Sequence, residues 1–238
     1  YYRSVDSTGP RIEELPAIIP FLQTDAIGHI DVILSEPVDL ATFDHADLQL
    51  MLNGQPVDTS EMVVTHLSGT SYRINGLTSL TGQDGNYELT VDARGILGLA
   101  GGVGENSDSI RWAKASNGAV VLSLSSVAPN PRDVPVSEIE VTFSHPINPA
   151  TYGLANLALT RDGGANLINN AVTISPVSST SFRVNGLASA TMPEGEYQFR
   201  VLATGVQDTS GNAGSGSLST DWGMAGTGPA LDANAQLA

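Results

Sequence analysis

The chain contains two copies of one sequence, and this internal repeat constrains its fold more than any other feature. The stretch SYRINGL at Ser71–Leu77 returns as SFRVNGL at Ser181–Leu187. The match continues in both directions at an offset of 109 or 110 residues, for example from GNYELTVDA at 85–93 to GEYQFRVLA at 195–203. A repeat of this length corresponds to one small domain. We therefore expect two domains of the same fold.

The alignment of the copies also sets the expected domain boundaries. The first domain is expected at residues 1–115 and the second at 116–225, which leaves a tail at 226–238. Within the tail, TGPALD at 227–232 copies TGPRIE at 8–13. The tail is expected to be the first strand of a third repeat, within a longer chain or paired with the sheet edge of a neighbouring molecule. An unordered terminus rich in glycine and alanine is the alternative. The chain does not open with methionine, so we expect it to be a piece of a longer protein.

Within each copy, apolar and polar residues alternate with a period of two, as in Tyr87, Leu89 and Val91. Such alternation is typical of strands with one buried face. The first copy gives about seven strands, near 10–19, 29–35, 47–53, 61–66, 71–77, 86–93 and 108–113. Helical periodicity is limited to single turns near Leu40–His45 and Pro149–Leu154. Seven short strands indicate an all-β fold, with two tandem immunoglobulin-like or fibronectin-III-like sandwiches arranged end to end.

The repeated stretch SYRINGL is expected to be scaffold. Tyr72 and Ile74 are predicted to face the core, and Asn-Gly tolerates the left-handed backbone of the turn that ends the strand. Leu77 is predicted to close the core behind that turn. Tyr87 and Tyr197 occupy the position of a tyrosine corner, where the hydroxyl bonds to the backbone a few residues upstream. An ordinary core tyrosine is the alternative at both positions.

The charge balance narrows the classes of partner. With 25 acidic and 10 basic residues, the formal net charge is −15. A surface this acidic repels phosphate groups and anionic lipid heads, so we expect no nucleic-acid partner and no direct membrane insertion. The chain has no cysteine, which excludes disulfides and thiolate chemistry. The single lysine, Lys114, is predicted to lie in the linker, which argues against a crosslink formed by a core lysine.

The pattern resembles bacterial Ig-like domains of surface-layer proteins and large adhesins. The second copy carries the resemblance best, through SVAPNPRDVPVSEIEVTFSHPINPAT at 126–151 and EYQFRVLATGVQDTSGNAG at 196–214. The first copy matches through VILSEPVDLAT but has ARGILGLAGGVG at 93–104 in place of the DTSGN turn. The resemblance covers nearly the whole chain. It implies the sandwich fold and an extracellular or cell-surface location, and it leaves the function open, because such domains serve as spacers, stalks, adhesin arms and enzyme appendages.

Motifs for catalysis are absent from the sequence. There is no G-x-S-x-G, H-E-x-x-H or P-loop pattern. The four histidines, His29, His45, His66 and His145, are predicted to lie on different elements and form no pair with ligand spacing. We therefore expect no enzymatic activity.

Calcium is the one ligand for which the sequence offers candidates. The turn DTSGN at 208–212 presents Asp208, Asn212 and backbone carbonyls, and Ca²⁺ prefers oxygen ligands from flexible loops. Asp6 precedes the first expected strand and is a further candidate. The alternative is a plain turn in which Asp208 bonds its own backbone.

Two classes of function remain open. The first is a non-catalytic structural or adhesive repeat segment of a larger extracellular bacterial surface protein, acting as a spacer or filament-forming module. Its expected partners are neighbouring Ig-like domains of the same chain, with self-association through a sheet edge or the tail. The second is a carbohydrate- or protein-binding accessory module of a secreted multidomain enzyme.

Overall fold

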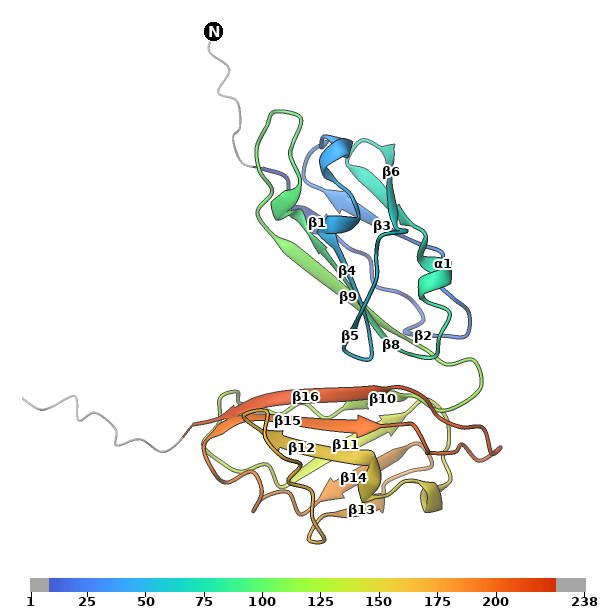
Figure 1. The fold of residues 1–238 in the computed structure, drawn as a ribbon, viewed down its shortest axis with the longest axis vertical. Helices are drawn as coiled ribbons and strands as arrows, with labels where there is room; N and C mark the ends of the chain where they lie inside the picture. Colours follow the sequence, from blue (N-terminus) through green and yellow to red (C-terminus); the bar gives the residue numbers. More distant parts are fainter. Residues whose placement is uncertain (1–8, 226–238) are drawn as a thin grey trace, which may run out of the picture. The chain divides into compact units, whose positions relative to one another are not determined.

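The computed structural model describes residues 9–225, so Asp6 and the tail at 226–238 lie outside the described residues. The chain divides into two compact units, Tyr1–Val120 and Val121–Ala238, called unit 1 and unit 2 below (Figure 1). Both are built from strands, as predicted. The boundary predicted after Ala115 stays a prediction. No helix among the described residues has the length and apolar character needed to cross a membrane.

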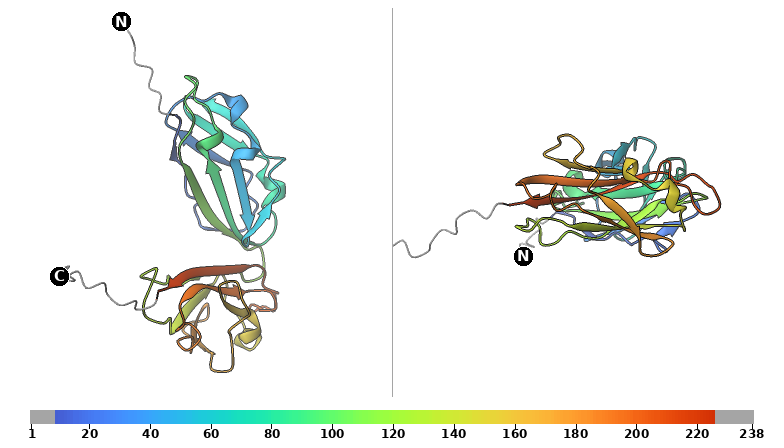
Figure 2. Two further views of the ribbon diagram at one scale, coloured as in Figure 1. Left: turned by 60° about the vertical axis from the view of Figure 1, so that its left-hand side comes forward. Right: turned by 90° about the horizontal axis from the view of Figure 1, so that it is seen from below.

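Unit 1 has two sheets whose inner faces share one core (Figure 2). The first sheet has the order β1 (Ile12–Glu14), β3 (His29–Leu34), β7 (Ser71–Asn75), β6 (Val63–Ser68). The second has the order β2 (Leu22–Gln23), β9 (Ser107–Lys114), β8 (Gly85–Asp92), β4 (Leu48–Leu52), β5 (Gln55–Val57). All pairs are antiparallel except β2 with β9, which is parallel.

Unit 2 repeats this plan with fewer strands. One sheet has the order β10 (Val121–Leu124), β11 (Glu138–Phe143), β14 (Ser181–Asn185), β13 (Thr173–Pro176). The other has the order β12 (Leu157–Arg161), β15 (Gly195–Leu202), β16 (Ser217–Met224). The counterpart of β2 is a single parallel bridge between Arg132 and Met224. Both units are therefore immunoglobulin-like sandwiches.

The alternation of the sequence determines which side chains are buried. Strand β8 alternates between buried and partly exposed positions along its whole length, and Leu89 and Val91 are fully buried. The core of each unit also holds a stacked tyrosine–tryptophan pair, Tyr87 with Trp112 and Tyr197 with Trp222. The Tyr87 hydroxyl donates to the Gln83 carbonyl at 2.8 Å, and the Tyr197 hydroxyl donates to the Pro193 carbonyl at 2.7 Å. Both tyrosines form the predicted tyrosine corner.

The Asn-Gly turn within SYRINGL forms as predicted. Gly76 has φ +86° and Gly186 has φ +82°, a left-handed backbone that glycine adopts without strain. A β-carbon on Gly76 would also lie 2.5 Å from the Glu61 carbonyl oxygen. Leu77 and Leu187 follow the turn and are fully buried. The repeated stretch therefore encodes a core strand and the turn that ends it.

Several short elements differ from the sequence predictions. The strand expected at 10–19 contains only β1 (Ile12–Glu14), and the sequence analysis missed β2, β5 and the single helical turn α1 (Leu77–Leu80). The helical turns expected near residues 40–45 and 149–154 are present as 3-10 turns. The 3-10 turns are η1 (Leu40–Thr42), η2 (His45–Asp47), η3 (Ala93–Gly95), η4 (Pro149–Thr151) and η5 (Leu154–Asn156).

Candidate functional site

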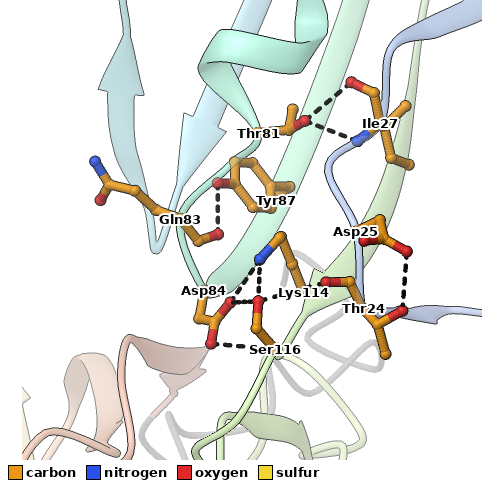
Figure 3. Close-up of polar contacts among 9 residues, drawn as sticks. All are labelled: Thr24, Asp25, Ile27, Thr81, Gln83, Asp84, Tyr87, Lys114 and Ser116. Carbon is orange, nitrogen blue, oxygen red and sulfur yellow. Dashed lines mark hydrogen bonds and ion pairs between the residues drawn. The ribbon is translucent and has the colours of Figure 1, made fainter.

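Lys114 lies inside unit 1 and not in a linker, which corrects the sequence prediction. It is the last residue of β9 and is 5% exposed. Its Nζ donates to Asp84 Oδ1 at 2.8 Å, and Asp84 stands in the tyrosine-corner loop just before β8 (Figure 3). A buried amine is costly unless it is paired, and this carboxylate supplies the pairing.

Ser116 extends this contact along the chain beyond β9. Its backbone N–H donates to Asp84 Oδ2 at 2.9 Å, and its hydroxyl donates to Asp84 Oδ1 at 2.9 Å (Figure 3). The Ala115 N–H donates to the Gln23 carbonyl at 3.0 Å. Residues 114–116 are thus tied to two other segments of unit 1. We call the group Lys114, Asp84 and Ser116 the exit clasp.

The charges of the exit clasp favour a fixed ion pair. Burial disfavours the charged form of Asp84, but the hydrogen bonds from Lys114 and Ser116 outweigh it, so the pKa of Asp84 lies below its ordinary value. Burial also raises the pKa of the neighbouring Tyr87 to about 12. Asp84 is therefore ionised and Tyr87 neutral at neutral pH. Such a group holds structure and offers no activated nucleophile.

A buried threonine completes the polar framework near the clasp. The Thr81 hydroxyl donates to the Ile27 carbonyl at 3.0 Å and accepts from the Ile27 N–H at 2.9 Å (Figure 3). Thr191 repeats the donated bond in unit 2: its hydroxyl donates to the Val136 carbonyl at 2.9 Å. Neither threonine and no part of the clasp was among the functional residues predicted from the sequence. A sequence signal for the two threonines was present, because each copy has a threonine five residues after the glycine of its Asn-Gly turn.

The calcium candidates Asp208 and Asn212 form a compact turn, which is the candidate site that the sequence predicted. Asp208 Oδ1 accepts from the backbone N–H groups of Ser210 and Asn212, both at 2.8 Å, and Oδ2 accepts from the Asn212 side-chain amide at 2.8 Å. These bonds, with that from the Asn212 side chain the largest, hold the pKa of Asp208 below its ordinary value. The turn borders a polar hollow of about 460 Å³ with Asn148 and Gln207.

The structure brings Asp208 and Asn212 together, while Asp6 lies outside the described residues. Both Asp208 oxygens already accept N–H groups, so the turn is satisfied in the way the plain-turn alternative expects. Among residues 9–225, no three His, Asp or Glu side chains gather in a way that could hold a metal. Calcium binding therefore stays a prediction from the sequence alone, and the hydrogen bonds of Asp208 favour the plain turn.

In unit 1 the same turn carries a different set of side chains. Gly98 replaces Asp208, yet the backbone bonds are the same: Gly98 N–H donates to the Gly102 carbonyl, as Asp208 N–H donates to the Asn212 carbonyl. A β-carbon on Gly98 would lie 2.4 Å from Glu36 Oε1. The Glu36 carboxylate therefore occupies the space beside the turn that a side chain at position 98 would need.

Comparisons with known proteins gave one family match and several similar solved structures. The family model described as a bacterial Ig-like domain matches residues 116–222. No curated protein matches the chain. Similar solved structures include the titin I-band fragment I67–I69 (14% identity, TM-score 0.29), the N-terminal part of the bacterial S-layer protein SbsC (15%, 0.31) and the titin Ig tandem A164–A165 (10%, 0.29).

Each of these three likenesses covers 91% of this chain. The chain spans 66% of the I67–I69 fragment, 44% of the S-layer fragment and 96% of the A164–A165 tandem. The family match, in contrast, is confined to the second copy of the repeat. Residues 116–222 are thus similar to bacterial Ig-like domains.

Proposed function

We propose that the chain is a non-catalytic structural segment of a bacterial cell-surface protein, in which the two units act as a spacer. The family match of residues 116–222 supports a bacterial Ig-like module. The polar groups buried in the described residues also support it. Tyr87, Thr81 and Lys114 each bond to a neighbouring segment of the same unit, so they brace the scaffold.

The exit clasp is the observation that carries this proposal furthest. A spacer sets a distance only if the chain leaves each domain in a fixed direction. Asp84 fixes Lys114 and Ser116 through both of its oxygens, at the point where the last strand of unit 1 ends. The clasp therefore stiffens the start of the segment that leads to unit 2. The expected partners are neighbouring Ig-like domains of the same chain.

Small-angle X-ray scattering on the 238-residue chain tests the spacer. A single compact globule of this length would have a radius of gyration of about 18 Å. A spacer with its units end to end should give a clearly larger radius and an elongated distance distribution. The Lys114→Met variant, which copies Met224, should broaden that distribution. A compact particle near 18 Å would contradict the proposal.

A further inference from the structure

Strand β6 leaves one edge of unit 1 open to pairing. It is the last strand of its sheet and pairs only with β7 among the described strands. Its six residues carry no Asp, Glu, Lys, Arg or Pro, and its outward side chains Val63 and Leu67 are 57% and 45% exposed. Natural edge strands are usually blunted by charges, proline or a cover, because an open edge recruits another strand. The stretch Val63–His66, which precedes a register shift between His66 and Ser68, has none of these charges and no proline.

The corresponding edge of unit 2 is protected. Pro176 pairs with Phe182 in β14, as His66 pairs with Tyr72 in β7, and Thr173 stands where β6 has Val63. Proline has no N–H to offer to an added strand. The open edge is thus specific to the first copy.

The hydrogen-bond register shows which backbone groups of β6 face outward. Leu34 N–H donates to the Thr70 carbonyl, so the alternate residues Tyr72 and Ile74 bond towards β3. The residues between them bond towards β6, where Arg73 is paired with Thr65. The backbone groups of Val64 and His66 therefore point away from β7.

An apolar pocket lies at the end of this open edge. It has a volume of about 400 Å³, and its lining includes Pro37, Leu40, His66, Gly69, Tyr72 and Leu99. Its walls are held in place: the His66 ring lies 5.2 Å from the Tyr72 ring, and the Tyr72 hydroxyl accepts from the Val38 N–H at 2.9 Å. Leu99 is 72% exposed at the rim. The pocket is preformed and can hold one aliphatic side chain.

Carboxylates flank both ends of β6. Glu61 lies two residues before the strand, and Glu36 lies beside the pocket against Gly98. Among the described residues, neither forms a salt bridge. The nearest cation on the sheet, Arg73, is committed to Asp31 at 2.6 Å. The local charge therefore favours a basic partner.

We propose that β6 and the adjoining pocket form a docking site for an extended basic peptide segment of a partner protein. The segment adds as a strand to β6, exchanges backbone hydrogen bonds with Val64 and His66, and inserts an aliphatic side chain between Leu99 and Tyr72. Main-chain bonds supply affinity in this mode of recognition, and the pocket supplies specificity. This binding role goes beyond the spacer function and does not depend on it.

The test uses the full chain labelled with ¹⁵N and the peptide acetyl-Lys-Val-Thr-Leu-Lys-Val-Lys-amide as probe. Titration should shift the amide resonances of Val64, His66 and Leu99 and leave unit 2 unchanged. The same peptide with glutamate in place of lysine, and a version N-methylated along one edge, should bind at least about tenfold more weakly.

Two variants copied from unit 2 sharpen the test. His66→Pro reproduces Pro176 and Leu99→Thr reproduces Thr209, and each should weaken binding by about tenfold. Val177→Thr, at an exposed position of unit 2, is the matched control and should bind normally. Leu99→Thr alone decides the matter if His66→Pro fails to fold.

Three results would overturn the proposal: no binding at millimolar peptide, equal binding by wild type and Leu99→Thr, or shifts in β13. Shifts at β6 that depend on protein concentration without peptide would assign the edge to a second copy of the chain instead.

Discussion

In unit 1 the stacked pair Tyr87 and Trp112 lies beside an ion pair, whereas the stacked pair of unit 2 ends next to an apolar methionine. Lys114 and Met224 occupy the same position at the end of the last strand, and both are buried. The rings are stacked in almost the same way, with interplanar angles of 8° and 7°. The core therefore does not require the ion pair. Its presence in one copy only points to a role outside core packing.

The turn at the opposite end of the sheets shows a second exchange. In unit 2 the carboxylate near the turn belongs to Asp208 on the turn itself, with His145 nearby. In unit 1 it belongs to Glu36, and the turn position is Gly98. The backbone bonds are kept while the side chains change. The interior strands of this sandwich are therefore tightly constrained, while side chains at its ends can change without a change in the backbone bonds.

The largest expected effect comes from truncating a core side chain in one unit while the core of the other unit stays intact. Phe199→Ala should lower the free energy of unfolding of unit 2 by about 3–5 kcal/mol, because the ring is fully buried. The matched variant Leu89→Ala should lower that of unit 1 by about 2–5 kcal/mol. Calorimetry on the full chain should show one transition moving in each variant. If each variant moved both transitions, the two cores would not be independent.

Breaking the exit clasp should affect unit 1 alone. Lys114→Met leaves the Asp84 carboxylate half-buried without its cation, which should cost about 3 kcal/mol. That figure is the low end of the range for buried pairs, because the Asp84 side chain is 20% exposed. Replacing Met224 with leucine is the control and should cost less than about 1.5 kcal/mol. If the melting transition of unit 1 were unchanged in Lys114→Met, the ion pair would not stabilise unit 1.

At acid pH, wild type and Lys114→Met should have the same free energy of unfolding. The pKa of Asp84 is lowered in the folded protein, so its stabilisation is present above the ordinary aspartate pKa of about 3.9 and is lost as pH falls through the folded value. Urea unfolding between pH 6 and pH 2 should show a stability gap that closes below about pH 4. A gap that persisted in acid would mean that Lys114 acts through packing.

A buried hydroxyl in unit 2 offers a stabilising change. Tyr152 is 5% exposed, and its hydroxyl has no hydrogen-bond partner among the described residues. Unit 1 has Phe43 at this position, also buried. Tyr152→Phe should therefore stabilise unit 2 by about 1 kcal/mol, because it removes an unpaired polar atom from the core. A lower melting temperature for unit 2 would show that the hydroxyl has a partner.

The smallest expected effect concerns calcium. Both Asp208 oxygens are occupied by N–H donors, so we expect millimolar Ca²⁺ to leave both melting transitions unchanged. A ligand that binds only the folded state raises its melting temperature. An increase confined to unit 2 and lost in Asp208→Ala would establish the calcium site instead.

The sequence predicted what repeats and missed what depends on contacts between distant segments. Alternation located β8, and the Asn-Gly turn within SYRINGL and both tyrosine corners formed as expected. Strand β2 has two residues and forms through its pairing with β9. A strand this short has no alternating pattern from which it could be predicted. Lys114 looked like a linker residue because its partner Asp84 is 30 positions away. The open edge of β6 became visible only through the sheet order.

Fluorine NMR on the full chain labelled with 5-fluorotryptophan follows the unfolding of each sandwich separately, since each unit holds one tryptophan, Trp112 or Trp222. Through a urea titration, the two signals should pass from native to unfolded at separate midpoints. Phe199→Ala should move only the Trp222 midpoint, and Lys114→Met only that of Trp112. A single shared midpoint that moves as one in both variants would contradict two independent sandwiches.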